Sequence, residues 1–464
     1  MIRCPRLMIA GLGGDTGKTA ISVGLCRALQ KLGHRVVPFK KGPDYIDMGW
    51  LSRAARHPCF NVDLFLMKRE QVLSCFGTNA GNADIAIIEG NRGLYDGMDV
   101  EGSVSTAETA KLLKSPVILV VDCTKVTRTV AALVLGCQTF DKEVPIGGVI
   151  LNKLATPRHE SVIRQSVERY CGIPVVGAMP KLRDITFPGR HLGLVPPEEH
   201  PAVEGAIDTA AELVEKHLDF ELLWKIASAA PSLDFHPEAH HEIPGEKITI
   251  GIIRDSAFQF YYQENIEALR RAGARLIEFS ALKDDLPPSL DALYIGGGFP
   301  ETHAALLSGN AALRRSIRKA ADEGLPIYAE CGGLMYLAEE LVLEGKKYPM
   351  AGIFPAAIGV SKKPQGHGYT VVEVEKPNPF FATGKTLHGH EFHYSFVAEM
   401  AENSDVYFAF HMVKGQGIRN KKDGLCFRNV LATYTHLHAF GTSGWVNGLV
   451  NRAMIYKKKC LSVD

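Results

Sequence analysis

The feature that most constrains this chain is the alternation of short apolar runs with helical patterns over residues 6–180. Runs rich in β-branched and apolar residues predict strands at 6–10, 35–39, 84–89, 116–121 and 146–152. Helical patterns such as 18–31 and 126–137 separate several of them. Strands that are apolar throughout, with helices between them, are typical of a parallel sheet covered on both faces. The first part of the chain therefore predicts an α/β fold.

The pattern changes in the middle of the chain and then resumes. A polar helix is predicted at 202–228, and the Pro-, His- and Glu-containing stretch that follows is typical of a linker. A second α/β pattern starts at 247–251, with a helix near 257–272 and strands at 291–295 and 325–329. A length of 464 residues accommodates two or three domains. We predict domains over 1–228 and 247–464, joined by a linker over 229–246.

Composition and charge exclude several classes of protein. The hydrophobic fraction is 46%, the charged fraction is 22%, and 52 basic residues balance 51 acidic ones. These values exclude disorder as the main state and give no basic footprint for nucleic acid. No apolar run approaches the roughly 20 residues that span a bilayer. Ten cysteines without a Cys-x-x-Cys pair predict reduced thiols. We expect a cytoplasmic protein without a nucleic-acid or membrane partner.

A glycine-rich loop lies between the first strand and the helix after it. Backbone N–H groups of such a loop converge on phosphate oxygens, and the helix N-terminus adds its positive end. The spacing is not the full GxxxxGK[ST] pattern, because Leu12 stands at the first glycine position. A glycine turn without nucleotide is the alternative; the strand–turn–helix context favours phosphate. The predicted ATP-binding residues here are Gly13, Gly14, Asp15, Thr16, Gly17, Lys18 and Thr19, with the Thr19 hydroxyl also predicted to ligate Mg²⁺.

Charged residues follow the next two strands, at the edge where open α/β sheets bind ligands. Glu89 is the first candidate for a carboxylate that reaches Mg²⁺, and Asp47 is the second. Lys40 is a candidate for neutralising charge on a transferring phosphoryl group. Asn152, at the end of the fifth strand, is a candidate for contact with the nucleotide base, although a solvated loop is equally compatible. Whether Asp96 and Asp99 bind a ligand or cap turns stays open.

The second half places a cysteine between an apolar strand and a helix, in the run Glu330-Cys331-Gly332-Gly333. Such a sharp turn lifts a nucleophile out of a sheet, and a helix N-terminus favours its thiolate, so we expect a lowered pKa for Cys331. The Gly332 N–H is a candidate oxyanion donor. The Gly296–Gly298 turn is a candidate for the other donor, at Gly298. A buried structural cysteine is the alternative.

A thiolate nucleophile needs a base, and the run 432–438 carries two histidines. We predict that His436 is the base, with His438 as the second candidate. The run 388–393 contains three further histidines. For it we favour packing or substrate contact over a structural zinc site.

A phosphate loop joined to a cysteine amidotransferase domain indicates one chemistry: ATP activates a carboxylate as a mixed anhydride, and ammonia from glutamine attacks it. Here the chain resembles the cobyrinic acid a,c-diamide synthase family over nearly its full length. The resemblance rests on several separate motifs in order. They are 40–47 (KKGPDYID), 89–97 (EGNRGLYDG), 191–196 (HLGLVP), 254–262 (RDSAFQFYY), 296–301 (GGGFPE), 330–333 (ECGG) and 389–395 (GHEFHYS).

The resemblance implies a fold and a reaction. It implies an N-terminal P-loop NTPase-like parallel sheet similar to dethiobiotin synthetase, and a C-terminal domain similar to class I glutamine amidotransferases. It also implies amidation of tetrapyrrole acetate side chains with ATP, Mg²⁺ and L-glutamine. Cys331 would then be the glutaminase nucleophile and His436 its partner, and His438 stands where the wider class has a Glu. Further candidates for contact with the tetrapyrrole are Asp44, Tyr45, Tyr95, Asp96 and His191.

Two departures from the family pattern concern the substrate. Lys41 and Arg92 stand where family members commonly have apolar residues, and both add positive charge near the expected acidic macrocycle. Both changes resemble the siroheme amidase branch, so they favour siroheme over cobyrinate as the acceptor; surface drift is the alternative. A homodimer stays open. The pair Cys331 and His436 argues against a non-enzymatic nucleotide switch and against a ligase that does not use glutamine.

Overall fold

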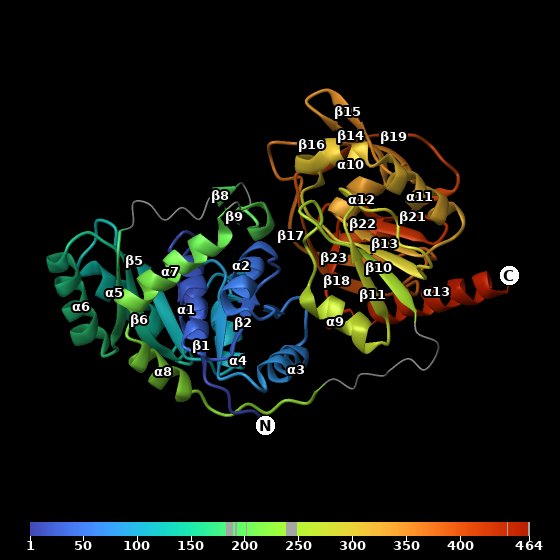
Figure 1. Ribbon diagram of the computed structural model, residues 1–464. Helices are drawn as coiled ribbons and strands as arrows, with labels where there is room; N and C mark the ends of the chain where they lie inside the picture. The colour runs from blue at the N-terminus through green and yellow to red at the C-terminus, as the bar shows by residue number, and fades with distance from the viewer. Residues whose placement is uncertain (182–188, 191–192, 201, 238–247, 443, 463–464) are drawn as a thin grey trace. The chain divides into compact units, whose positions relative to one another are not determined.

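The computed structural model describes residues 1–181, 189–190, 193–200, 202–237, 248–442 and 444–462. The chain divides into two compact units, Met1–Glu238 and Ala239–Asp464 (Figure 1). The linker predicted over 229–246 lies partly outside the described residues. In its described part, Leu233 pairs with Ile2 near the N-terminus through an N–H···O bond of 2.8 Å. No helix in the described ranges has the length and apolar character needed to cross a bilayer.

The first unit contains a seven-stranded sheet in the order β3-β2-β4-β1-β5-β6-β7. Every neighbouring pair in it is parallel, so the α/β fold with a parallel sheet is confirmed. The sequence patterns did not predict β3 and β7. The strands are β1 (Arg6–Gly11), β2 (Val36–Lys41), β3 (Phe60–Val62), β4 (Ile85–Glu89), β5 (Val117–Asp122), β6 (Ile146–Leu154) and β7 (Val175–Pro180).

Helices connect these strands. Helix α1 packs closely against α7, and Gly24 permits this approach, because a Cβ there would lie 2.5 Å from the Ala210 carbonyl oxygen. The helices are α1 (Lys18–Lys31), α2 (Ile46–Ala55), α3 (Arg69–Ala80), α4 (Thr106–Leu112), α5 (Thr129–Phe140), α6 (Pro157–Cys171), the 3-10 helix η1 (Pro197–Glu199), α7 (Val203–His217) and α8 (Phe220–Ser228). A small pair, β8 (Gly189–Arg190) and β9 (Gly193–Leu194), forms a separate antiparallel sheet.

The prediction of one polar helix over 202–228 is wrong, because the chain breaks between α7 and α8. The Asp219 N–H donates to the Val176 carbonyl of β7 at 2.9 Å, which pulls the backbone out of the helix. The Asp219 side chain then accepts from the Leu222 N–H at 2.9 Å and caps α8. Aspartate favours this position because its oxygen satisfies an otherwise unpaired N–H of the first turn.

The second unit contains a ten-stranded sheet in the order β11-β10-β12-β13-β22-β21-β20-β17-β18-β23. Its first five strands are parallel, and the remaining pairs are antiparallel. The strands are β10 (Thr249–Ile253), β11 (Arg275–Phe279), β12 (Ala292–Ile295), β13 (Ile327–Glu330), β17 (Gly366–Val374), β18 (Thr386–His393), β20 (Val406–Lys414), β21 (Lys422–Phe427), β22 (Val430–Thr433) and β23 (His436–Leu437).

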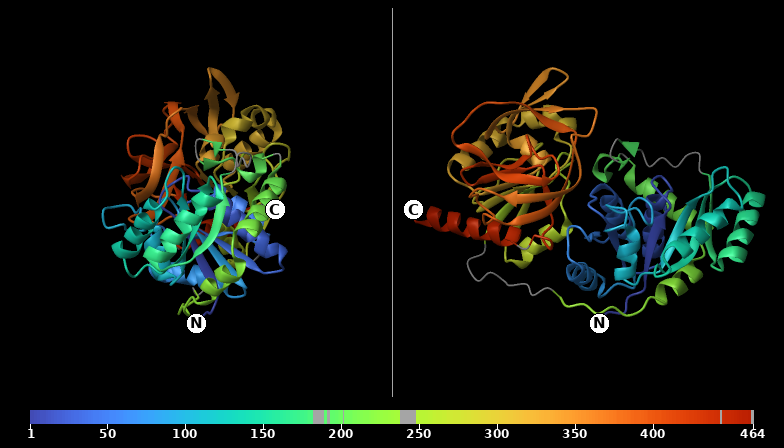
Figure 2. Two further views of the ribbon diagram at one scale, coloured as in Figure 1. Left: turned by 90° about the vertical axis from the view of Figure 1, so that its left-hand side faces the viewer. Right: turned by 180° about the vertical axis from the view of Figure 1, so that it is seen from behind.

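A smaller sheet and six helical segments complete the described part of this unit. The sheet has the order β15-β14-β16-β19, built from β14 (Ala338–Leu343), β15 (Lys346–Pro349), β16 (Phe354–Val360) and β19 (Ser395–Met400). The helices are α9 (Gln263–Arg271), η2 (Pro300–His303), α10 (Ala304–Gly309), α11 (Ala311–Asp322), α12 (Gly332–Leu337) and α13 (Gly444–Leu461). Helix α13, the red helix that leads to the C-terminal end (Figure 2), packs against β12 and α9 according to the contacts between these elements.

The helix predicted near 257–272 begins later than expected, at Gln263. The Asp255 side chain accepts from the N–H groups of Ala257 and Phe258 at 2.8 and 3.1 Å and holds this segment as a turn. Asp in such a turn competes with helix formation by offering the backbone a local acceptor. The turn has a function in the fold, because the Ala257 carbonyl then packs against the Gly298 backbone.

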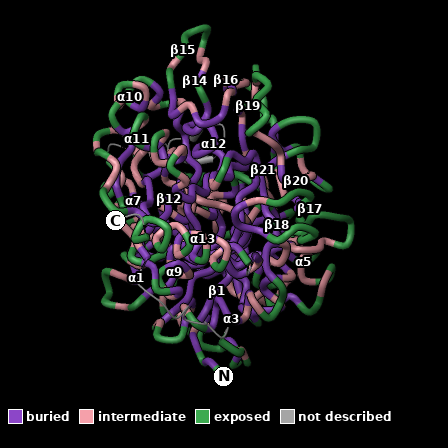
Figure 3. The backbone as a smooth tube through the Cα atoms, turned by 90° about the vertical axis from the view of Figure 1, so that its right-hand side faces the viewer, coloured by how far each residue is buried: buried purple, intermediate pink, exposed green. Residues whose placement is uncertain are grey.

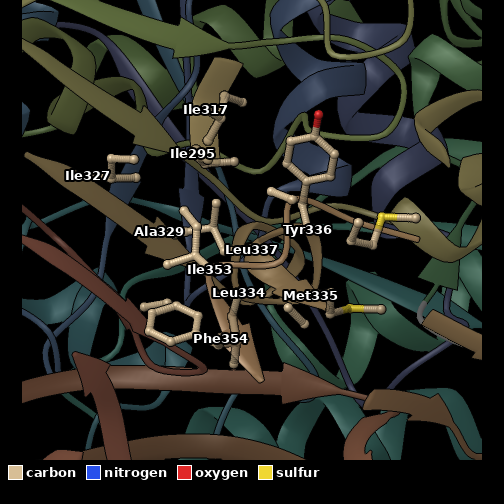
Figure 4. Packing of buried hydrophobic residues seen from close by; sticks show 14 of the residues in the cluster. Ile295, Ile317, Ile327, Ala329, Leu334, Met335, Tyr336, Leu337, Ile353 and Phe354 are labelled. Atoms are coloured by element: carbon tan, nitrogen blue, oxygen red, sulfur yellow. The ribbon is translucent and has the colours of Figure 1, made fainter. Parts of the chain in front are cut away.

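Alternation along the parallel strands divides the core of the second unit between its two faces. Leu293 and Ile295 of β12 join one buried cluster with α10, α11 and α12, whereas Ala292 and Tyr294 join the other with α9 and α13. This period of two is what a strand covered on both sides requires. Figure 4 shows the first cluster, in which Ile295 and Leu334 are labelled. Exposed residues gather mainly in turns and outer helices (Figure 3).

Candidate active sites

The glycine-rich loop of the first unit joins β1 to α1. Gly17 precedes the helix with φ +89°, a left-handed conformation that glycine adopts without penalty. A Cβ on Gly13 or Gly14 would meet nothing within 4 Å, so the backbone there is open to a ligand. The buried Lys18 ammonium donates to the Gly13 carbonyl at 2.7 Å and so folds back over the loop. The loop therefore has the form of an anion cradle.

Asn152 lies behind this loop, at the end of β6. Its amide nitrogen donates to the Thr16 carbonyl at 2.8 Å, and its amide oxygen accepts from the Lys153 N–H at 2.9 Å. A Cβ on Gly17 would lie 2.3 Å from the Asn152 amide nitrogen. In this arrangement Asn152 holds the loop; its contact with the nucleotide base stays a prediction.

Four side chains that the sequence singled out meet beside the loop. The Thr19 hydroxyl donates to Glu89 Oε1 at 2.8 Å and lies 3.4 Å from Asp47 Oδ2. The Lys40 ammonium bridges the same two carboxylates, at 2.6 Å from Asp47 and 2.7 Å from Glu89. The carboxyl ends of β2 and β4 bring these residues together, because the two strands are parallel neighbours.

Burial and charge act against each other in this cluster. Burial disfavours charge on Lys40, but Asp47, Glu89 and Asp44 outweigh it and raise its pKa well above the usual value. Burial also works against the charge on Asp47, but Lys40 and hydrogen bonds lower its pKa. Burial and the Asp47 charge raise the pKa of Glu89 against the influence of Lys40. Among the described residues no donor reaches Glu89 Oε2, which leaves one buried oxygen for a further partner.

Lys41 and Arg92, the two basic residues at positions where the resembled family commonly has apolar ones, lie near each other. Lys41 is buried, with 4% of its surface exposed, and Arg92 is exposed in the loop after β4. A Cβ on Gly42 would lie 2.9 Å from the Asn91 amide nitrogen, so the two loops touch. Burial lowers the pKa of Lys41, and the charges of Lys40 and Arg92 lower it further against the attraction of Asp63. Ion pairs in the described part of the chain engage Lys40 but not Lys41.

The other residues that the sequence predicts to contact the tetrapyrrole lie in different surroundings from one another. Asp44 lies 3.8 Å from Lys40, and burial together with the Asp47 charge raises its pKa to about 7. Tyr45 precedes α2 beside it. The Tyr95 hydroxyl donates to the Cys137 carbonyl of α5 at 2.5 Å. Asp96 accepts from the Gly93 N–H at 2.8 Å, as a residue that caps a turn does. His191 lies outside the described residues.

In the second unit, Cys331 forms the turn between β13 and α12. Its backbone adopts φ +48° and ψ −99°, a conformation that costs a non-glycine residue about 1–3 kcal/mol. The Cys331 N–H donates to the Thr433 carbonyl at 2.7 Å, which fixes the turn to β22. Strain concentrated at one residue between a strand and a helix is typical of a nucleophile elbow.

The two candidate oxyanion glycines border this turn. A Cβ on Gly332 would lie 3.0 Å from the Gly298 nitrogen, so the two backbone segments are adjacent. Gly298 has φ +155°, and a Cβ there would lie 2.0 Å from the Ala257 carbonyl oxygen. Only glycine fits this position. The two glycines that carry the candidate N–H groups are therefore neighbours beside the Cys331 turn.

His436, in β23, lies next to the Gly296–Gly298 turn. The imidazole Nδ1 lies 3.3 Å from Glu330 Oε2, and a Cβ on Gly297 would lie 2.6 Å from its Cε1 and 3.3 Å from its Nε2. His438 instead lies 3.6 Å from Glu264 and packs edge-on against Tyr262. Of the two candidate bases, it is therefore His436 that borders the glycine turn beside the cysteine.

Two histidines of β18, His390 and His393, pack around this group. The His390 ring stacks on His436 with centroids 4.9 Å apart, and its Nδ1 lies 3.0 Å from the Tyr262 hydroxyl. His393 stacks on Tyr434 at 3.6 Å. Over the described ranges no group of three or more His, Cys, Asp or Glu side chains has a metal-binding arrangement. The contacts of these histidines are those of packing residues.

The expectation of a lowered pKa for Cys331 is wrong. Burial raises the pKa of the thiol, the Glu301 charge raises it further, and a hydrogen bond from the Gly332 backbone only partly opposes them. Helix α12 has six residues, so its dipole is small. The thiol is therefore protonated in this state and needs a base in order to react.

Alkylation of Cys331 by iodoacetamide should therefore be slow near neutral pH. Only the thiolate reacts, and a raised pKa lowers its fraction at every pH below that value. We expect the rate to keep rising beyond pH 9, above the ordinary thiol pKa of about 8.5. The exposed Cys460 serves as the reference thiol in the same peptide-mapping experiment. A rate that levels off below pH 8 would show a lowered pKa instead.

Two residues that contact or shape the candidate site were not singled out from the sequence. Glu330 lies directly before the cysteine, but its contact with His436 depends on the pairing of β18 with β23. Asp423 is fully buried and accepts from the Thr433 hydroxyl at 2.7 Å and the Tyr434 N–H at 3.0 Å. It thereby shapes the segment that leads to His436. The position of Glu330 at a strand end was the one available signal; Asp423 gave none.

Comparison with known proteins agrees with this geometry. Residues 7–195 match the family model described as a CobQ/CobB/MinD/ParA nucleotide binding domain. Residues 249–443 match the model described as a CobB/CobQ-like glutamine amidotransferase domain. A cobyrinate a,c-diamide synthase of Magnetococcus marinus is 44% identical over 96% of each chain. A synthase of the same name from Archaeoglobus fulgidus is 41% identical over 98% of each chain.

These matches confirm the expected fold class and family and the prediction of an enzyme that uses glutamine. The first unit carries a nucleotide-binding domain, and the second carries a glutamine amidotransferase domain. The relatives are matched over nearly their whole length, so the two domains occur together in them. The chain therefore belongs to the cobyrinate a,c-diamide synthase family, and it is a ligase of the glutamine amidotransferase type.

Proposed function

We propose that this enzyme uses ATP and L-glutamine to convert acetate carboxylates of a tetrapyrrole into carboxamides. In the first unit, a substrate carboxylate oxygen attacks the γ-phosphorus of ATP, and ADP leaves. The product is an acyl phosphate. Ammonia then attacks the acyl carbon and expels inorganic phosphate. The phosphate loop with Lys18 would hold the transferring phosphates, and Lys40 would offset their charge.

The residues beside the loop also suit a magnesium ion. Mg²⁺ prefers hard oxygen ligands and is held in nucleotide sites by one or two carboxylates together with phosphates. Glu89 Oε2 is buried without a donor from the described residues, and Thr19 and Asp47 lie on the same side of the cluster. Thr19, Asp47 and Glu89 would hold the ion, which when bound supplies positive charge to the phosphate oxygens.

In the second unit, the Cys331 sulfur attacks the carboxamide carbon of glutamine. The thiol proton passes to His436 and then to the leaving ammonia, and a γ-glutamyl thioester remains on Cys331. Water hydrolyses the thioester to glutamate and restores the thiol. The Gly298 backbone borders Gly332, whose N–H reaches the Cys331 sulfur, and the two N–H groups would stabilise the oxyanion of each tetrahedral intermediate.

The acceptor that we propose is siroheme, and the observation that carries it is the buried Lys41 ammonium. Asp63 attracts this ammonium, but among the described residues no carboxylate forms an ion pair with it, and a buried cation is costly unless a ligand pairs with it. Arg92 adds a second positive charge nearby. Carboxylates of the macrocycle supply the matching negative charge. Cobyrinate is the second candidate, favoured by the names of the relatives.

The acceptor is tested by offering siroheme, sirohydrochlorin and cobyrinate in parallel with ATP, Mg²⁺ and glutamine. Mass spectrometry identifies the product, because each amidation replaces OH by NH₂. We expect siroheme to give the highest kcat/KM. Conversion of cobyrinate alone would overturn the siroheme assignment and leave the amidation chemistry in place, whereas no conversion of any of the three would overturn the proposed function.

Replacing Lys41 by leucine should raise the KM for siroheme about 10- to 100-fold, because one buried charge-assisted contact is lost. The KM for glutamine and the rate of glutamine hydrolysis should not change. Lys31→Leu is the matched control, since Lys31 lies at the exposed end of α1 and pairs with Asp208. An unchanged KM for siroheme in Lys41→Leu would mean that this ammonium does not contact the acceptor.

A further inference from the structure

Glu330 is the last residue of β13 and is fully buried. Its two oxygens meet four groups that can donate. Oε2 lies 3.3 Å from His436 Nδ1 and accepts from the Tyr294 hydroxyl at 3.2 Å. Oε1 accepts from the Tyr328 hydroxyl at 3.0 Å and from the Leu437 N–H at 3.1 Å. The carboxylate is therefore an acceptor at both oxygens.

The hydroxyls of Tyr294 and Tyr328 keep both Glu330 oxygens as hydrogen-bond acceptors. Burial and the Glu330 charge raise the pKa of Tyr294 and Tyr328 well above the usual value. Both hydroxyls therefore remain protonated and donate. An acceptor at Oε2 requires the hydrogen of the neutral His436 imidazole to be on Nδ1, which leaves Nε2 as a proton acceptor. The ring edge that carries Nε2 faces the Gly297 turn beside the cysteine.

His390 packs against the face of the His436 imidazole ring. The two imidazoles stack with centroids 4.9 Å apart and an interplanar angle of 18°, and the residues are paired across β18 and β23. Burial and the neighbouring histidines lower the pKa of His390 well below the usual value. His390 therefore stays neutral and places no positive charge against His436 when His436 takes up a proton.

We propose that Glu330 is the positioning residue of the glutaminase site, holding His436 in the tautomer whose Nε2 receives the Cys331 thiol proton. Glu330 takes no proton itself; it orients the imidazole and stabilises the imidazolium that forms. The wider class that this domain resembles has a glutamate two residues after the histidine. Here that position is His438, which lies against Glu264. The carboxylate thus comes from the strand of the nucleophile.

This inference rests on the proposed glutaminase reaction, so its test measures release of glutamate from glutamine. In Glu330→Gln we expect kcat to fall about 100-fold, because an amide can donate to Nδ1 and favour the wrong tautomer. The KM for glutamine should stay within about threefold, since the residue does not touch the substrate. The remaining activity should rise with pH, because the Cys331 thiol, whose pKa burial raises, then loses its proton without help from His436.

The matched control is Glu264→Gln, which makes the same change at the buried carboxylate that lies 3.6 Å from His438 instead of His436. It should lose less than about threefold in kcat, because His438 does not border the glycine turn beside the cysteine. Retention of activity in Glu330→Gln within about threefold would overturn the proposal. Lack of glutamate release by the unmodified enzyme would overturn the proposed function instead.

A second measurement uses the unmodified protein and does not depend on how the variant folds. Nitrogen-15 NMR of histidine-labelled enzyme reports which imidazole nitrogen carries hydrogen, and the His436 signals are those lost in His436→Gln. We expect a protonated Nδ1 and an unprotonated Nε2 near neutral pH. An unprotonated Nδ1 would overturn the proposal, because Glu330 would then not be the acceptor.

Discussion

Replacing Cys331 by alanine is expected to abolish glutamine-driven amidation and to leave ammonium-driven amidation intact. The substitution removes the sulfur that attacks the carboxamide, and no other group can form the thioester. We expect the glutamine-driven rate to fall at least about 10⁴-fold. High ammonium replaces the missing product of the second unit, so the first unit continues to amidate. The two rates are compared in one assay of the amidated tetrapyrrole.

The matched control is Cys426→Ala, which removes another buried thiol of the same unit. The Cys426 sulfur donates to the Gly424 carbonyl, away from the elbow. It should retain glutamine-driven activity within about threefold. Loss of ammonium-driven activity in Cys331→Ala would mean that Cys331 supports the fold. Unchanged glutamine-driven activity would mean that Cys331 is not the nucleophile.

Replacing Lys18 by alanine is expected to impair amidation with either nitrogen source and to spare part of the glutamine hydrolysis. The ammonium of this residue closes over the phosphate loop, and its charge is the one placed to meet the terminal phosphates. We expect ATP-dependent amidation to fall about 10³-fold with either nitrogen source. Glutamine hydrolysis should persist in part, because Cys331 and His436 belong to the other compact unit. Measurements of ADP and glutamate release separate the two reactions.

Lys31→Ala is the control for this variant, since Lys31 ends the same helix and is half-exposed. Its ATP-dependent rate should not change measurably, as is usual for a surface ion pair. Amidation that persists in Lys18→Ala would show that the phosphate-loop assignment is wrong. Loss of ATP affinity in Lys31→Ala as well would point to a general effect on α1 rather than to the phosphates.

Local patterns predicted most of the parallel strands, because each signal is contained within a few residues. The run 84–89 predicted β4, and 18–31 predicted α1 with its observed bounds. The failures have a different origin. Asp219 ended a predicted helix because the chain pairs with Val176 of β7, and Asp255 delayed another by capping a turn that packs on Gly298. Long-range contacts of this kind override local helical preference.

The candidate sites, too, could be predicted where the signal is local and could not where it depends on long-range contacts. The phosphate loop and the cysteine turn could be predicted because a strand, a glycine-rich turn and a helix are continuous in the sequence. The grouping of Thr19, Lys40, Asp47 and Glu89 also followed from it, since parallel strands end at one edge of their sheet. The environment of the cysteine could not be predicted, because desolvation depends on every element packed around the thiol.

The sequence by itself determined the order of the elements, the two glycine-rich turns and the kinds of side chain at their ends, since these depend on neighbours along the chain. Only the tertiary structure decided which carboxylate faces His436 and that burial raises the pKa of the Cys331 thiol. It also decided that Asn152 holds the phosphate loop. Each of these depends on contacts between segments far apart in the sequence, where burial and hydrogen bonding set the chemistry.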